Sequence, residues 1–228
     1  RFHSGRQVTA EDVAYSLRRS GSRALSSPTA LAYLSDIVGM RAYFFGLEDD
    51  VEGIEVVDER TIRLTIDAPK PYFLAKLTYP TAFVVDRDEV EDDRNWTRRP
   101  NGTGPYKLVE WRLGERIILE ANEDYHLGEP QLKEAVYLLS GGSALTRWEN
   151  DELDVAPISV NDIDRARDPS SDLGPYYSAW PQFSLSYLAF NTNVPPFDDV
   201  HVRRAMGMAI DRDRIANVTF DGMFFPAT

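Results

Sequence analysis

The stretch that decides the fold covers residues 187–212 and reads YLAFNTNVPPFDDVHVRRAMGMAIDR. Its aromatic, apolar start belongs to a run, Leu185–Asn191, that we interpret as a central strand buried on both faces. Pro195-Pro196 interrupts the chain, and residues 200–210 then show the apolar spacing of a helix. Asp211 is placed to cap a further turn. A strand followed by a proline break and a capped helix indicates an α/β chain.

Elements of both kinds are expected along the whole sequence. Thr9 is a candidate N-cap, and Asp12 sits at the position that completes a capping box, so a helix should start at Ala10. In 62–66, apolar and polar residues alternate, as in a half-buried strand. The other expected elements are a helix over 29–44, a hairpin over 53–66, a short helix over 71–77, a buried strand at 82–85, a hairpin over 104–121, a strand at 135–139 and a helix starting near 142–143.

A polar, charged stretch between Asp86 and Pro100 has few apolar residues, which favours a crossing between two domains. Residues 1–5 have the pattern of the tail of a strand. We therefore expect the chain to be a piece of a longer protein.

Composition restricts the function. The 228 residues are 43% hydrophobic, enough for real cores, and the net charge of −12 argues against a nucleic-acid partner. The sequence has no cysteine, which excludes thiol catalysis and thiolate metal sites. No apolar run reaches the roughly 18 residues that a membrane-spanning helix needs.

Neither catalysis nor a metal or cofactor site is indicated. His3, His126 and His201 stand far apart and form no pair at metal-ligand spacing. Gly102-Thr103-Gly104 is followed by a strand pattern, so we interpret it as a tight turn and not as a phosphate loop. Gly141-Gly142-Ser143 could bind an anion, but capping of a helix is favoured. The acidic runs are interpreted as solvated surface: Glu48-Asp49-Asp50, Glu91-Asp92-Asp93 and Asp198-Asp199.

Five segments in order resemble the family of oligopeptide-, dipeptide- and nickel-binding proteins, solute-binding protein family 5. The last segment is the most specific, because its strand, Asn-Thr-Asn, proline break, capped helix and Ala-Ile-Asp-Arg must occur in register. The segments are Phe2–Gly5 with Thr9–Val13, Val51–Asp58, Gly102–Leu108, Trp148–Val155, and Tyr187–Asn193 continued by Pro195–Val200, Arg203–Ala205 and Ala209–Arg212.

The resemblance implies a fold of the α/β class, the periplasmic binding protein-like fold (type II, family 5), in which two lobes close on a ligand. Residues 1–98 would form the extra small domain of the first lobe, 99–195 its body, and 196–228 the beginning of the second lobe. About half of the family's usual length would be covered.

The implied function is the substrate-binding component of an ABC importer, without enzyme activity. It would capture a peptide or a similar small solute and deliver it to permease subunits in the membrane. The implied location is periplasmic or extracellular, with a lipoprotein anchor as an option through a segment outside this chain. Two alternatives stay open: a ligand-sensing domain of a transcription regulator with the same fold, and a secreted hydrolase.

The candidate ligand-binding residues are Trp180, Tyr187 and Asn191, which flank or lie in the expected central strand. Ligands of open α/β sheets sit at the carboxyl ends of such strands. The alternative is that Tyr187 and Phe190 are core residues and that Asn191 braces a hinge. We favour residues 193–196 as one strand of that hinge. The apolar face of the helix after residue 199 should need a covering body, and the chain alone should bind peptides weakly.

Overall fold

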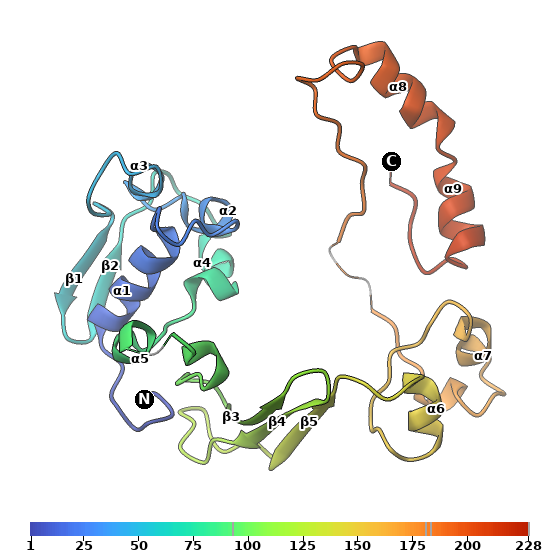
Figure 1. The fold of residues 1–228 in the computed structure, drawn as a ribbon, viewed down its shortest axis with the longest axis horizontal. Coiled ribbons are helices and arrows are strands. Elements are labelled where there is room, and N and C mark those ends of the chain that lie inside the picture. The colour runs from blue at the N-terminus through green and yellow to red at the C-terminus, as the bar shows by residue number, and fades with distance from the viewer. Residues whose placement is uncertain (93, 181, 183, 228) are drawn as a thin grey trace. The chain divides into compact units, whose positions relative to one another are not determined.

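The computed structural model describes residues 1–92, 94–180, 182 and 184–227 (Figure 1). Helices and strands both occur, which confirms the α/β class. The chain forms two compact units, Arg1–Ser140 and Gly141–Thr228. The predicted borders at 98/99 and 195/196 do not coincide with this division and stay predictions about the complete protein.

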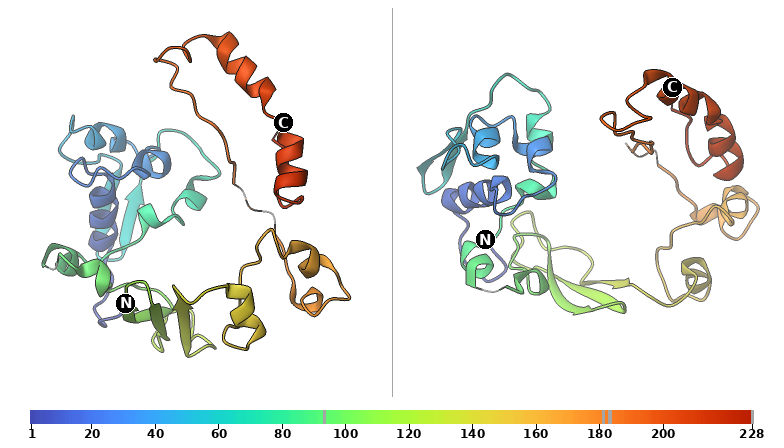
Figure 2. Two further views of the ribbon diagram at one scale, coloured as in Figure 1. Left: turned by 45° about the vertical axis from the view of Figure 1, so that its right-hand side comes forward. Right: turned by 45° about the horizontal axis from the view of Figure 1, so that its top comes forward.

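The first unit contains two sheets and short helices (Figures 1 and 2). Its helical elements are α1 (Ala10–Gly21), α2 (Ala30–Leu34), α3 (Met40–Phe44), α4 (Phe73–Lys76), η1 (Pro80–Ala82), α5 (Arg87–Asp92) and η2 (Trp96–Arg98). Its strands are β1 (Ile54–Asp58), β2 (Thr61–Leu64), β3 (Tyr106–Arg112), β4 (Arg116–Ala121) and β5 (Glu134–Leu138).

Helix α1 starts where the sequence predicts, because Thr9 and Asp12 form a capping box. Asp12 N donates to Thr9 Oγ1 at 3.3 Å, and Thr9 N donates to Asp12 Oδ2 at 2.8 Å. Two of the helix's otherwise unpaired amides are thereby satisfied. The helix packs on the β1–β2 hairpin, and its Ala14 and Leu17 are buried in the core that they share with Ile54.

The expected helix over 29–44 is wrong as one element, since the structure has α2 and α3 with a break between them. In the break Val38 N donates to Thr65 O, and Gly53 N donates to Val38 O at 2.8 Å. Gly39 has a φ of 81°, and a Cβ there would lie 2.9 Å from the backbone nitrogen of Glu52. Bonding to the neighbouring hairpin therefore replaces the helical hydrogen bonds.

The expected strand at 82–85 is also wrong. No ladder forms there, and Val85 N instead donates to the hydroxyl oxygen of Ser16 at 2.9 Å. Ser16 is buried on α1, so this segment is held by a side chain and needs no strand partner. The short helix predicted over 71–77 is confirmed as α4, with narrower bounds.

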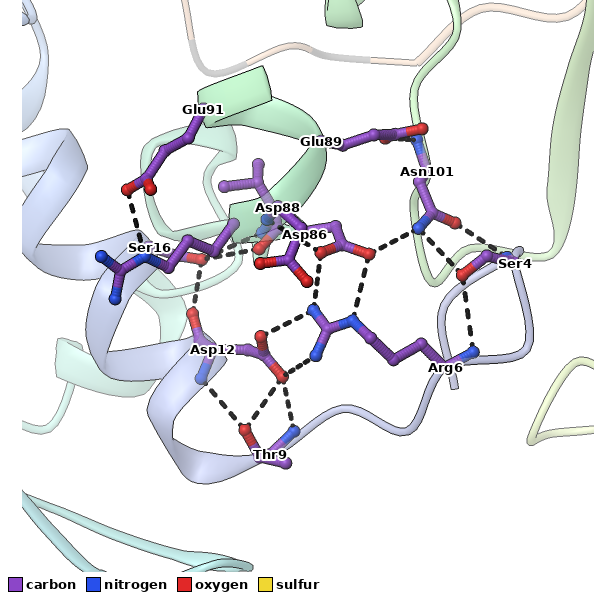
Figure 3. A network of polar contacts seen from close by, with 12 residues as sticks. Ser4, Arg6, Thr9, Asp12, Ser16, Asp86, Asp88, Glu89, Glu91 and Asn101 are labelled. Atoms are coloured by element: carbon purple, nitrogen blue, oxygen red, sulfur yellow. Dashed lines mark hydrogen bonds and ion pairs between the residues drawn. The ribbon is translucent and has the colours of Figure 1, made fainter. Parts of the chain in front are cut away.

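A polar network joins the chain's first residues to α1 and to the segment 86–101 (Figure 3). At its centre the Arg6 guanidinium donates to both carboxylate oxygens of Asp12 (2.8 and 3.1 Å) and to both of Asp86 (2.7 and 3.2 Å). Asn101 Nδ2 donates to Asp86 Oδ2 at 2.7 Å, and Ser4 N donates to Asn101 Oδ1 at 2.8 Å. The charged stretch predicted as a crossing is thus anchored to the N-terminal segment.

The carboxylates of this network are buried, which makes their pairing with Arg6 necessary. Burial raises the pKa of Asp12, but the hydrogen bonds donated by Arg6 and Thr9 outweigh it and leave the pKa below its ordinary 3.8. The hydrogen bonds that Arg6 donates to Asp12 and to Asp86 raise the pKa of Arg6 above its ordinary value. Both partners therefore stay charged at neutral pH.

The second sheet has the order β3-β4-β5, with both pairs antiparallel. The predicted hairpin over 104–121 and the predicted strand at 135–139 are confirmed. The predicted tight turn at Gly102-Thr103-Gly104 instead lies along the N-terminal segment: His3 N donates to Gly102 O at 2.8 Å.

The second unit is built from short helices around a small core of Leu145, Ala166 and Leu173. Ser143 caps its first helix by accepting from Thr146 N, as the sequence predicts. Asp199 and Asp211 likewise cap later helices, which confirms the helix predicted over 200–210. The elements are α6 (Ala144–Glu149), α7 (Ile163–Arg167), η3 (Gly174–Tyr176), α8 (Val200–Ala209), α9 (Arg212–Arg214) and η4 (Ile215–Thr219).

The run Leu185–Asn191 is not the buried central strand that its composition predicts. Its residues from Leu185 onward have no strand conformation, and Leu185, Tyr187 and Leu188 are exposed. A strand needs neighbours for its backbone hydrogen bonds, and the described residues place no strand beside this run. The apolar face of α8 is likewise uncovered, since α8 buries none of its residues.

Replacing Arg6 with Ala should destabilise the first unit by about 2–3 kcal/mol, because two buried carboxylates lose their partner. This expected loss of stability is smaller than for a fully buried ion pair, because the Arg6 side chain is 36% exposed. Urea unfolding monitored by circular dichroism at pH 7 measures the loss.

The matched control is Arg63→Ala, which removes an exposed pair with Glu55 and should cost less than about 1 kcal/mol. Because the folded pKa of Asp12 is lowered, its stabilising contribution is present above pH 3.8 and is lost as the pH falls below that value. In Arg6→Ala, the free energy of unfolding should therefore fall less steeply as the pH is lowered below 3.8. Equal losses for the two variants would contradict the central role of Arg6.

Replacing Gly39 with Ala should destabilise the first unit by about 1–3 kcal/mol, because the backbone is left-handed there and a Cβ meets the Glu52 backbone. Gly104→Ala is the control: nothing lies within 4 Å of its Cβ position, and the change should stay within about 0.5 kcal/mol. Thermal melts of both variants measure the change in stability. A melting temperature of Gly39→Ala equal to that of the parent protein would contradict the requirement for glycine at this position.

Candidate functional site

The second unit contains a hollow of about 880 Å³, within the size range of small-molecule sites. It is lined by α6, residues 154–158, α7, residues 173–180 and residues 222–225. Leu145, Ile163 and Leu173, which are buried, form its apolar floor.

Aromatic side chains dominate the wall of the hollow. Trp148 and Tyr176 meet edge to face with ring centroids 5.3 Å apart, and Tyr177 packs against the core beneath them. Trp180, one of the predicted ligand residues, lines the same hollow with 79% of its surface exposed. Phe225 completes the aromatic set. Exposed rings around a concave surface can bind apolar and cationic groups.

Local sequence explains how these rings are presented. Leu145 and Trp148 are three residues apart on α6, so they share one face of that helix. Ile163 and Ala166 have the same spacing on α7, where both are buried. Arg165 ties the two helices: it pairs with Glu149 at 2.6 Å and with Asp172 at 2.5 Å. These two carboxylates, Asp172 first, raise the pKa of Arg165 above its ordinary value.

One wall of the hollow is held by Arg167. Its Nη1 donates to the backbone oxygen of Asp221 at 2.7 Å and lies 3.7 Å from Asp221 Oδ2. The Asp221 carboxylate, by a shared hydrogen bond and by its charge, raises the pKa of Asp164 above its ordinary 3.8. This cluster fastens the turn before Gly222 and Met223 to α7.

The structure brings only one of the three predicted ligand residues to the hollow. Tyr187 is 76% exposed and does not line it. Asn191 is exposed, and its Oδ1 accepts from the backbone nitrogen of Asn193 at 3.1 Å. A common site for Trp180, Tyr187 and Asn191 therefore stays a prediction. The sequence analysis missed Trp148 and Tyr176, although the 145/148 spacing on α6 could have pointed to Trp148.

Among the described residues, no cluster of three or more His, Asp or Glu side chains could hold a metal ion. His3 Nε2 contacts the backbone oxygen of Gly104 at 3.0 Å, and its Nδ1 has no partner. Asp93, part of one acidic run, lies outside the described residues. Within the described ranges, no helix is both long and apolar enough to cross a membrane.

An α/β fold with a concave, aromatic surface has the features of the class of binding proteins. Over residues 1–228 the chain matches the family described as Bacterial extracellular solute-binding proteins, family 5 Middle. The chain belongs to family 5 of the bacterial extracellular solute-binding proteins. This confirms the resemblance found in the sequence.

Similar proteins agree with this assignment. The periplasmic oligopeptide-binding protein OppA of Escherichia coli (strain K12) is 30% identical over 226 residues, which cover 95% of this chain and 41% of OppA. The dipeptide-binding protein DppE of Bacillus subtilis (strain 168) is 28% identical over 94% of this chain and 40% of its own. The structure of the Escherichia coli murein tripeptide binding protein MppA superposes with a TM-score of 0.87 at 28% identity. That superposition covers 97% of this chain and 45% of MppA. The chain thus spans less than half of the length of these relatives.

Replacing Arg167 with Ala should loosen the wall formed by residues 221–225, because the charged hydrogen bond to Asp221 is lost. Amide exchange in that segment should accelerate by about tenfold, which corresponds to one such bond. Hydrogen exchange read by mass spectrometry measures it. The exposed Arg204 of α8 serves as the control position, and unchanged exchange in Arg167→Ala would contradict the role of Arg167.

Proposed function

We propose that this chain is part of the substrate-binding component of an ABC importer. It captures a peptide or a similar small solute outside the cytoplasmic membrane and delivers it to the permease subunits. The observation that carries the proposal is the family match over residues 1–228. Relatives named as oligopeptide-, dipeptide- and murein-tripeptide-binding proteins support the ligand class.

Capture without chemistry is the second part of the proposal. The described residues offer no metal-ligating cluster. The causes of their perturbed carboxyl pKa values are structural: ion pairs such as Arg6–Asp12, hydrogen bonds from nearby amides and hydroxyls such as those of Ser170 to Asp168, and the Asp164–Asp221 contact. A hydrolase needs two carboxylates, or a nucleophile and a base, facing one cleft. Among the residues that the structure describes, Asp154 is the one carboxylate in the lining of the hollow. We therefore expect no turnover of peptides, esters or glycosides.

The layout of the complete protein follows from the same proposal. Residues 1–98 form the small domain of the first lobe, 99–195 its body, and 196–228 the beginning of the second lobe, with a hinge at 193–196. Trp180, Tyr187 and Asn191 then contribute to the ligand site. Closure of the lobes would bring them together with residues outside this chain. The protein works in the periplasm or outside the cell, with no nucleic-acid partner.

The test is calorimetric titration of the complete protein with a mixture of short peptides. We expect binding at micromolar or lower concentrations, and a weakening of about tenfold in Trp180→Ala, because one exposed ring of the site is lost. Trp96→Ala in the first unit is the control and should bind as the parent protein does. Absence of binding, or cleavage of the peptides during the titration, would refute the proposal.

A further inference from the structure

The aromatic hollow carries a charge that its own residues leave unbalanced. Of the described residues, two with charged side chains line it, Asp154 and Arg167. Arg167 is already engaged, since it donates to Asp221 O at 2.7 Å and lies 3.7 Å from the Asp221 carboxylate. Asp164 stands at the same cluster, hydrogen-bonded to Asp221. The positive charge in the wall is therefore offset locally.

Asp154 has no such partner. It makes no hydrogen bond or ion pair with another residue of the described ranges, whereas its acidic neighbours Glu149 and Glu152 are paired with Arg165 and Arg147. Among the described residues, the lining thus presents one unpaired carboxylate together with the aromatic side chains of Trp148, Tyr176 and Trp180. The net charge of the chain, −12, has the same sign.

This combination selects between classes of ligand group. An anion would be repelled by Asp154, and a neutral apolar group filling the hollow would bury that carboxylate without a partner, which is costly. A guanidinium or ammonium group on an aliphatic chain fits both the carboxylate and the aromatic walls. The positive group can form an ion pair with the carboxylate and a cation–π contact with the rings. Arginine adds planar stacking on tryptophan.

We propose that this hollow is a subsite for a positively charged side chain, arginine in particular, of the captured peptide. The inference rests on the proposed function, because it assigns a preference to the same binding protein. It adds the residues that set the preference: Asp154 for charge, and Trp148, Tyr176 and Trp180 for the aromatic walls. Trp180 was predicted as a ligand residue without this role.

The experiment compares two tripeptides that differ only in charge, Ala-Arg-Ala and Ala-citrulline-Ala, by calorimetry on the complete protein. Citrulline keeps the length and hydrogen-bonding end of arginine but is neutral. We expect the arginine peptide to bind about tenfold more tightly than the citrulline peptide. Asp154→Asn should remove this difference and leave the affinity for the citrulline peptide unchanged. Asp213→Asn, at an exposed position outside the hollow, is the control and should keep the full preference.

The outcomes separate the two proposals. If both peptides bind equally, or if Asp154→Asn keeps the preference, the subsite is refuted and the binding function stands. If neither peptide binds, both proposals fail. If Asp154→Asn and Trp180→Ala change only the melting temperature, a segment of the protein's own chain fills the hollow, and the subsite is refuted.

Discussion

The first unit depends on one guanidinium. Arg6 binds two buried carboxylates that lie far apart in the sequence, Asp12 on α1 and Asp86 before α5. Each carboxylate makes further hydrogen bonds. Asp12 completes the capping box of α1, and Asp86 accepts a hydrogen bond from Asn101, which in turn accepts one from the backbone nitrogen of Ser4. Removing the cation would leave both carboxylates buried without a counterion, which proteins do not tolerate well. The start of the chain, its first helix and the path into the second sheet are therefore fixed together.

Elements that depend on neighbours in sequence could be predicted. The capping box of α1, the caps Ser143, Asp199 and Asp211, and the β1–β2 and β3–β4 hairpins all follow from residues within one or two turns of each other. Their hydrogen bonds close locally, so no knowledge of the rest of the fold is needed. The α/β class could be predicted from these local elements, whereas the family was indicated by the resemblance of five sequence segments in order.

Elements that depend on distant partners could not be predicted. The helix expected over 29–44 is broken because Val38 bonds to Thr65 and Gly53, and the strand expected at 82–85 is replaced by a bond to Ser16. Leu185–Asn191 has the composition of a buried strand, but a strand also needs a neighbouring strand to pair with, and composition does not provide one. In each case the deciding hydrogen bond comes from another part of the chain or requires a partner that the described residues lack.

The candidate site shows the same limit at the level of side chains. Trp180 could be picked from the sequence as an aromatic residue flanking the expected strand. Trp148 and Tyr176, which line the same hollow, are brought there by the packing of α6, α7 and η3. Tyr187 is also near Trp180 in the sequence, yet it does not line the hollow. The selective element, Asp154, looks like any other acid in a chain of net charge −12. It becomes distinctive because, among the described residues, it is the carboxylate that lines the hollow, and it has no ion pair there. The specificity that we propose therefore depends on where the fold places this carboxylate.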